Sequence, residues 1–209
     1  MFGQISPVVK NLLILNVGIF ILQNLLVGYV EIYGRDIYTE YVTFYGSLYG
    51  VKSDFFYPFQ LITHMFLHGG FRHLLMNMLV LFFLGPILEQ TIGDKKFLLL
   101  YMICGLGAGV SQLAVNYGFH VNPDIPMLGA SGATMGVLMG TALFYPNLEM
   151  RLYFFIPIKL KYLALLAIVI DLFGGFGGQH TGIAHFAHLG GVLFSIALIA
   201  FWKKKGLFN

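Results

Sequence analysis

Long, nearly uninterrupted apolar runs are the feature of this sequence that most restricts its fold. A helix that crosses a bilayer needs about 20 mostly apolar residues, and six segments meet or approach that length. They lie at residues 11–29, 71–92, 96–116, 130–146, 160–175 and 183–202. Because the runs are continuous and do not alternate with a period of two, the sequence predicts an all-α integral membrane protein with a bundle of six spanning helices.

Composition supports this membrane class. The chain has 209 residues, of which 58% are hydrophobic and 10% are charged. Soluble domains carry about 25% charged residues, so a soluble protein of this size would lack the polar side chains to cover its surface. Twelve basic residues oppose nine acidic ones, a balance that does not favour a nucleic-acid partner. The single cysteine, Cys104, excludes a disulfide framework and a multi-cysteine metal site.

The basic residues also predict how the chain is oriented. With the N-terminus in the cytoplasm, nine of the twelve basic residues fall on the cytoplasmic side, and the exceptions are Arg35, Lys52 and Arg72. Positive charge concentrates on that side of membrane proteins, so we expect both termini in the cytoplasm. The compactness of the chain and this orientation favour a bacterial inner membrane. No linker interrupts the sequence, which predicts a single domain over residues 1–209.

The external segment 30–70 is long, rich in Tyr and Phe, and poor in charge. Loops of this length without structure of their own are uncommon, and aromatic side chains favour the membrane–water interface. We therefore expect a partly helical element that lies in the outer interface, between the first and second spans.

Polar residues inside membrane spans are rare and are candidates for function. Ser131 lies at a loop-to-helix junction within Gly129-Ala130-Ser131-Gly132. The first N–H groups of a helix lack intrahelical partners, so a serine there can combine a nucleophilic hydroxyl with a free backbone donor. A serine that only caps the helix would explain the same position without a catalytic role.

His188 lies in the sixth span and is a candidate general base for Ser131. Small residues recur every fourth position in the fourth span, at Gly132, Gly136 and Gly140. Gly191 follows His188 by three residues, and such small residues let membrane helices approach closely. The two spans could thus bring His188 within hydrogen-bond reach of Ser131. Ordinary helix packing, with His188 bonded to a backbone carbonyl, is the alternative.

His73 and Asn77 are four residues apart and share one face of the second span. Both donate hydrogen bonds while neutral, which suits a developing oxyanion in a membrane. A polar clamp between helices would explain them equally well. Nucleophile, base and neutral donors are together the three roles that serine hydrolysis requires.

These residues resemble the motifs of the rhomboid family of intramembrane serine proteases. In chain order the matching motifs are Thr63-His64-Met65-Phe66-Leu67-His68-Gly69-Gly70, His73-x-x-x-Asn77, Gly85-x-x-x-Glu89-x-x-x-Gly93, Gly129-Ala130-Ser131-Gly132 and Ala187-His188-x-x-Gly191. The resemblance covers residues from about 11 to 203. Two positions depart from the pattern of some members. Met135 stands where they carry an aromatic residue, and Phe59-Gln60 stands where they carry Trp-Arg.

The resemblance implies a Ser–His dyad that opens to the external face and cleaves single-span or multi-span membrane-protein substrates near the bilayer surface. Ser131 would be the nucleophile, and His188 the general base and later the acid. His73, Asn77 and the backbone N–H of Ser131 would line the oxyanion hole. The positions that would serve packing or structure are Gly129, Gly132, Gly191 and Glu89. No cofactor is implied.

Two histidine pairs and one carboxylate also need an interpretation. His185-x-x-His188, like His64-x-x-x-His68, has the spacing of metal ligands, but no His-Glu-x-x-His run accompanies either pair, so we expect no metal. Asp171, near the outer end of the fifth span, is the carboxylate available as a third member of the dyad. We expect it to cap a helix or lie at the interface, because a dyad without a carboxylate avoids a permanent charge in the membrane.

Two other functional classes compete with proteolysis. A catalytically silent relative that binds membrane clients would lack the serine or the histidine, and both are present. A transporter that relays protons through histidines predicts internal repeats and charges near mid-membrane, and we find neither. The glycine-rich run 173–178 predicts a mobile cap over a substrate entrance beside the fifth span.

Overall fold

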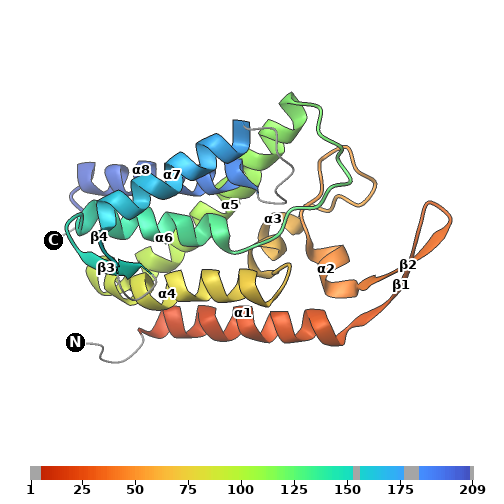
Figure 1. Cartoon of the computed structure of the whole chain (residues 1–209), viewed down its shortest axis with the longest axis horizontal. Helices are drawn as coiled ribbons and strands as arrows, with labels where there is room; N and C mark the ends of the chain where they lie inside the picture. The colour runs from red at the N-terminus through yellow and green to blue at the C-terminus, as the bar shows by residue number, and fades with distance from the viewer. Residues whose placement is uncertain (1–5, 153–155, 177–183, 208–209) are drawn as a thin grey trace.

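The computed structural model describes residues 6–152, 156–176 and 184–207, and it is mostly helical (Figure 1). The long helices are α1 (Pro7–Leu25), α4 (Phe71–Ile92), α5 (Asp94–Gly118), α6 (Ser131–Phe144), α7 (Leu160–Phe176) and α8 (His185–Lys204). The shorter elements are β1 (Val27–Ile32), β2 (Arg35–Glu40), α2 (Tyr41–Gly46), α3 (Gln60–Thr63), η1 (His64–Phe66), β3 (Glu149–Leu152) and β4 (Ile156–Lys159). The strands form two antiparallel hairpins, β1–β2 and β3–β4.

Four of the helices, α1, α4, α5 and α8, are long and apolar enough to cross a membrane. Helix α6 has 14 residues and α7 has 17. At 1.5 Å per residue α6 is about 21 Å long, against a hydrocarbon core of about 30 Å. An integral membrane protein is thus supported by four helices, and the count of six spans stays a prediction.

Helix α6 is the centre of the bundle and packs against α4, α5, α7 and α8. Its glycines face neighbours that leave no room for a side chain. A Cβ at Gly136 would lie 2.5 Å from both side-chain atoms of Cys104, and one at Gly132 would overlap Ala108. On α8, a Cβ at Gly191 would overlap the carbonyl of Gly132. The backbones of α6 and α8 are therefore in direct contact.

The N-terminus of α1 is tied to α4 by one buried carboxylate. Glu89 is 1% exposed and accepts hydrogen bonds from Ser6 Oγ at 2.6 Å, Val8 N at 3.0 Å and Val9 N at 2.9 Å. The first N–H groups of a helix need partners from outside it, and a negative group is favourable at that end of the helix dipole.

Residues 30–70 contain α2, α3 and η1, together with part of a hairpin that we did not expect. Strands β1 and β2 pair from Val27↔Glu40 to Ile32↔Arg35 and extend away from the helices (Figure 1). Tyr33 and Gly34 form the two-residue turn with φ of 51° and 74°, which matches the right-handed twist of paired strands. Helix α1 begins and ends four residues earlier than the expected span 11–29, and β1 begins at Val27.

Gln60 organises the remainder of this segment from a fully buried position. Its Nε2 donates to the carbonyls of Phe55 at 2.9 Å and Tyr45 at 3.1 Å. Its Oε1 accepts from the N–H groups of Tyr57 at 3.1 Å and Tyr49 at 3.4 Å. One side chain therefore satisfies four backbone groups that lie in no regular ladder.

Hydrogen bonds join this segment to the loop that precedes Ser131. Leu48 and Met127 exchange two backbone bonds of 2.8 Å, and Gly129 N donates to the carbonyl of His64 at 2.9 Å. The position of the loop before α6 is thus set by residues that precede it by more than 60 positions.

Candidate active site

Ser131 is the first residue of α6, and Gly129 sets its approach. Gly129 has φ of +134°, which a residue with a side chain rarely adopts. A Cβ there would also lie 2.7 Å from Cε1 and 2.9 Å from Nε2 of His73, and 3.4 Å from Ser131 Oγ. Only glycine therefore fits at this turn, and the ring of His73 and the hydroxyl of Ser131 border the same small space.

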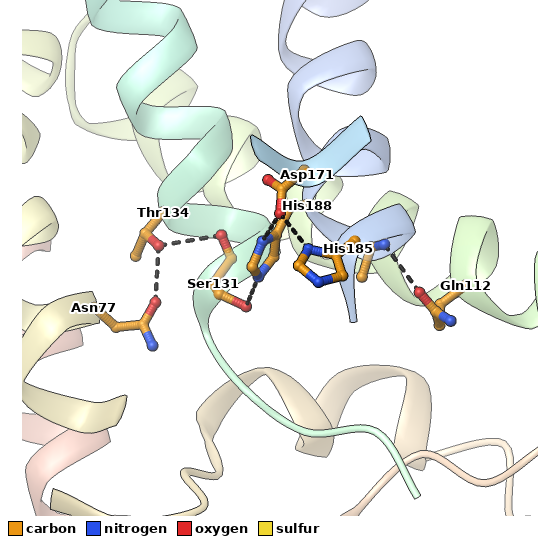
Figure 2. A network of polar contacts seen from close by, with 8 residues as sticks. Asn77, Gln112, Ser131, Thr134, Asp171, His185 and His188 are labelled. Carbon is orange, nitrogen blue, oxygen red and sulfur yellow. Dashed lines mark hydrogen bonds and ion pairs between the residues drawn. The ribbon is translucent and has the colours of Figure 1, made fainter. Parts of the chain in front are cut away.

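Ser131 and His188 are in hydrogen-bond contact. Ser131 Oγ lies 2.8 Å from His188 Nε2, although the residues are 57 positions apart and come from α6 and α8 (Figure 2). The close approach of Gly132 and Gly191 brings these helix ends together. His188 is partly exposed. A serine hydroxyl facing an imidazole nitrogen at this distance can transfer its proton while it attacks an electrophile.

The interpretation of Asp171 as a capping or interfacial residue is wrong. Asp171 is 4% exposed, and its Oδ1 lies 2.9 Å from Nδ1 of His188 and 2.9 Å from Nδ1 of His185 (Figure 2). A buried carboxylate is costly unless it is paired and hydrogen-bonded. The two imidazoles supply this pairing, so Asp171 belongs to the polar cluster around Ser131.

His73 and Asn77 have different surroundings. His73 Nδ1 lies 3.4 Å from Gly69 N, and its opposite ring edge faces the space beside Gly129. Asn77 Nδ2 donates to the carbonyl of His73 at 2.9 Å, and its Oδ1 lies 2.9 Å from Thr134 Oγ1. His73 thus borders the same space beside Gly129 as the serine hydroxyl. Asn77 is instead linked through Thr134 Oγ1 to the backbone carbonyl of Ser131, which lies 3.1 Å from that oxygen.

Sequence reasoning missed Thr134 and Gln112. Thr134 lies one helical turn beyond Ser131, and this spacing was the available signal. Gln112 Oε1 accepts the N–H of Ala187 at 3.1 Å, which anchors the first turn of α8 just before His188 (Figure 2). Nothing in the spacing connects Gln112 to α8, because the two lie 75 residues apart.

In the described parts of the chain no group of three or more His, Cys, Asp and Glu side chains is arranged to hold a metal ion. His64 and His68 are buried, and Nδ1 of His64 contacts the carbonyl of Gln60 at 2.7 Å. Much of the expected cap at 173–178 lies within α7, and its last two residues fall outside the described residues.

Comparisons with known proteins find related sequences. The Rhomboid domain family matches residues 56–205. The chain is 31% identical over 190 residues to Rhomboid protease GluP of Bacillus subtilis, covering 90% of this chain and 35% of that protein. It is 29% identical over 215 residues to the mitochondrial RHOMBOID-like protein 12 of Arabidopsis thaliana, covering 97% and 60%. Rhomboid-like protease 3 of Toxoplasma gondii is 27% identical over 163 residues, covering 77% and 57%.

The chain therefore spans roughly one third to three fifths of the length of these relatives. The family match alone covers more than half of the chain. Members of the matched family are usually intramembrane serine proteases, although some are pseudoproteases. Because the Rhomboid domain matches residues 56–205, this chain belongs to the rhomboid family.

Proposed function

We propose that this protein is an intramembrane serine endopeptidase that hydrolyses peptide bonds in or near transmembrane segments of other membrane proteins. The observation that carries the proposal is the 2.8 Å contact between Ser131 Oγ and His188 Nε2. A pseudoprotease would retain the fold without this pair. The whole chain, residues 1–209, would act as one domain in the bilayer.

In the proposed reaction His188 takes the proton of Ser131 as its Oγ attacks the scissile carbonyl. The carbonyl becomes a tetrahedral oxyanion, which the backbone N–H of Ser131 and the side chains of His73 and Asn77 would stabilise. His188 then gives its proton to the leaving amine, and water hydrolyses the acyl-enzyme by the same steps in reverse order.

The length of α6 supports a site below the membrane surface. The helix is about 9 Å shorter than the hydrocarbon core. If its far end lies at the cytoplasmic surface, Ser131 lies below the external one. A bond cleaved there belongs to a substrate segment in or near the membrane, and that segment must be locally unwound, because helical hydrogen bonds occupy its carbonyls. A bacterial inner membrane, with both termini in the cytoplasm, is the proposed setting.

The test uses purified protein in liposomes with a labelled single-span reporter and a serine-reactive fluorophosphonate. Wild type is compared with Ser131→Ala and His188→Ala, each with and without a metal chelator. We expect cleavage to be lost in both variants and to be insensitive to chelator. Cleavage that persists in Ser131→Ala would overturn the assignment, and failure of wild type to label or cut several reporters would favour a client-binding role.

A further inference from the structure

The polar cluster around Ser131 contains a third member that a Ser–His dyad does not require. We propose that Asp171 is a positioning residue, which holds the His188 ring with Nδ1 protonated and Nε2 directed at Ser131. This inference rests on the proposed function and adds to it a carboxylate from α7.

The geometry of the three side chains forms a continuous chain of contacts. Asp171 Oδ1 is 2.9 Å from His188 Nδ1, and His188 Nε2 is 2.8 Å from Ser131 Oγ (Figure 2). A carboxylate oxygen only accepts, so His188 Nδ1 must carry the proton in this contact. In the neutral ring Nε2 then has no proton, and this is the form that can accept one from the serine.

His185 holds the carboxylate in place from a second direction. Its Nδ1 lies 2.9 Å from the same Oδ1, and the ring centroids of His185 and His188 are 6.5 Å apart in an edge-to-face arrangement. The two donors come from one turn of α8, while the acceptor comes from α7. Asp171 therefore cannot rotate away from His188 without also leaving His185.

The burial of Asp171 adds a charge effect to the positional one. When His188 takes the proton of Ser131 it becomes a cation, and a lone cation in or near a bilayer is costly. A carboxylate in contact offsets that cost at the stage of the reaction where the cation exists. Within the described parts of the chain, the ionisable groups that face His188 are Asp171 from α7, His185 from α8 and His73 from α4. The polar side chains that α6 and α5 place near His188 are Ser131 and Gln112, and both are uncharged.

The variant that tests the proposal is Asp171→Asn, which keeps the shape and removes the charge. We expect kcat to fall by about 10²–10⁴-fold, with KM changed by less than about twofold, because an amide can hold the imidazole in the wrong tautomer. The acid limb of the pH–activity profile should move to lower pH, since the imidazolium loses its anionic partner. A merely structural role would lower activity in proportion to folded protein and leave the profile unmoved.

The matched control is Asp36→Asn, an exposed aspartate in β2 far from the cluster in sequence. It removes the same charge and should change neither kcat nor the pH profile. If Asp171→Asn cuts like wild type at every pH while Ser131→Ala is inactive, the proposed protease stands and the role of Asp171 is refuted.

A second measurement does not depend on activity. In protein labelled with ¹⁵N-histidine, the His188 signals, assigned by loss in His188→Gln, should report a protonated Nδ1 and an unprotonated Nε2. Asp171→Asn should shift this ring toward the opposite tautomer. An unprotonated Nδ1 in wild type, or a ring that Asp171→Asn leaves unchanged, would overturn the inference even if no reporter is ever cleaved.

Discussion

Two buried carboxylates, Glu89 and Asp171, show how one kind of group serves different ends in one bundle. They are 1% and 4% exposed, so each must be paired. Glu89 faces a hydroxyl and two backbone N–H groups at the start of α1. Asp171 faces two imidazole nitrogens at the start of α8.

The partners decide what each carboxylate can do. Backbone N–H groups do not titrate, so the environment of Glu89 is fixed and its contacts contribute to stability. Imidazoles gain and lose protons near neutral pH, so the environment of Asp171 changes as the proposed reaction proceeds. Burial alone therefore does not distinguish a structural carboxylate from a functional one, whereas the chemistry of its partners does.

Glu89→Ala should produce the largest loss of stability and sharpen this comparison. Removing the carboxylate leaves two buried donors and one partly buried donor without this partner, which costs about 3–5 kcal/mol. Thermal or denaturant unfolding in detergent would measure the loss, with exposed Glu149→Ala as the control. Activity per folded molecule should be retained. A structural role for Glu89 would be contradicted if Glu89→Ala is as stable as wild type, or if the variant stays folded and loses cleavage.

Buried histidines without a carboxylate provide the next test. Burial, with a smaller contribution from the nearby His73, lowers the pKa of His68 to about 4. Both ring nitrogens of His68 lack a hydrogen-bond partner among the residues that the structure describes. Burial likewise lowers the pKa of His64 to about 4. The unfolded chain, with an ordinary histidine pKa of about 6.5, therefore binds protons that the folded chain rejects.

Stability should consequently be full above pH 6.5 and fall as the pH drops toward 4. Each of the two histidines contributes about 2–3 kcal/mol to that fall. Unfolding measured across this range should show a shallower slope in His68→Gln than in wild type. Exposed His120→Gln should keep the wild-type slope. A slope that His68→Gln leaves unchanged would mean that His68 is protonated in the folded state, and it would remove the contrast with His188.

A partly exposed carboxylate should give the smallest effect. Hydrogen bonds from Ser53 Oγ at 2.7 Å and Tyr33 OH at 2.8 Å lower the pKa of Asp124. The resulting stabilisation exists above the unfolded pKa and is lost as the pH falls through the lower folded one. Because water surrounds these groups, Tyr33→Phe should lower Tm by about 1 °C at neutral pH. Tyr38→Phe in the same hairpin is the matched control, and a shift of many degrees in Tyr33→Phe alone would contradict this view.

The long helices of this fold can be predicted from the sequence because each coincides closely with a continuous apolar run. The expected segment 71–92 coincides with α4, and the segments 130–146 and 183–202 differ from α6 and α8 by one or two residues at each end. The glycines of α6 and α8 also predict that the two helices pack closely, because a helix face without side chains lets a neighbouring helix approach.

The β1–β2 hairpin and the contacts of Asp171 do not follow from the sequence, for different reasons. The β1–β2 hairpin has a local signal in the alternation around Tyr33-Gly34, but its aromatic residues also favour an interfacial element. Asp171 had no local signal, because its partners lie 14 and 17 residues further along the chain on a separate helix. Only the packing of α7 against α8 brings them together.

The order of α6, α7 and α8 has a consequence for biosynthesis. The ribosome delivers Ser131 first, Asp171 next and His188 after both. A nascent chain that has inserted α6 and α7 therefore holds the proposed nucleophile but not its base. On the proposed mechanism, such a chain would be inert toward other proteins passing through the same translocon. On the proposed mechanism, competence requires α8 to pack against α6, so insertion of α8 would act as the activating step.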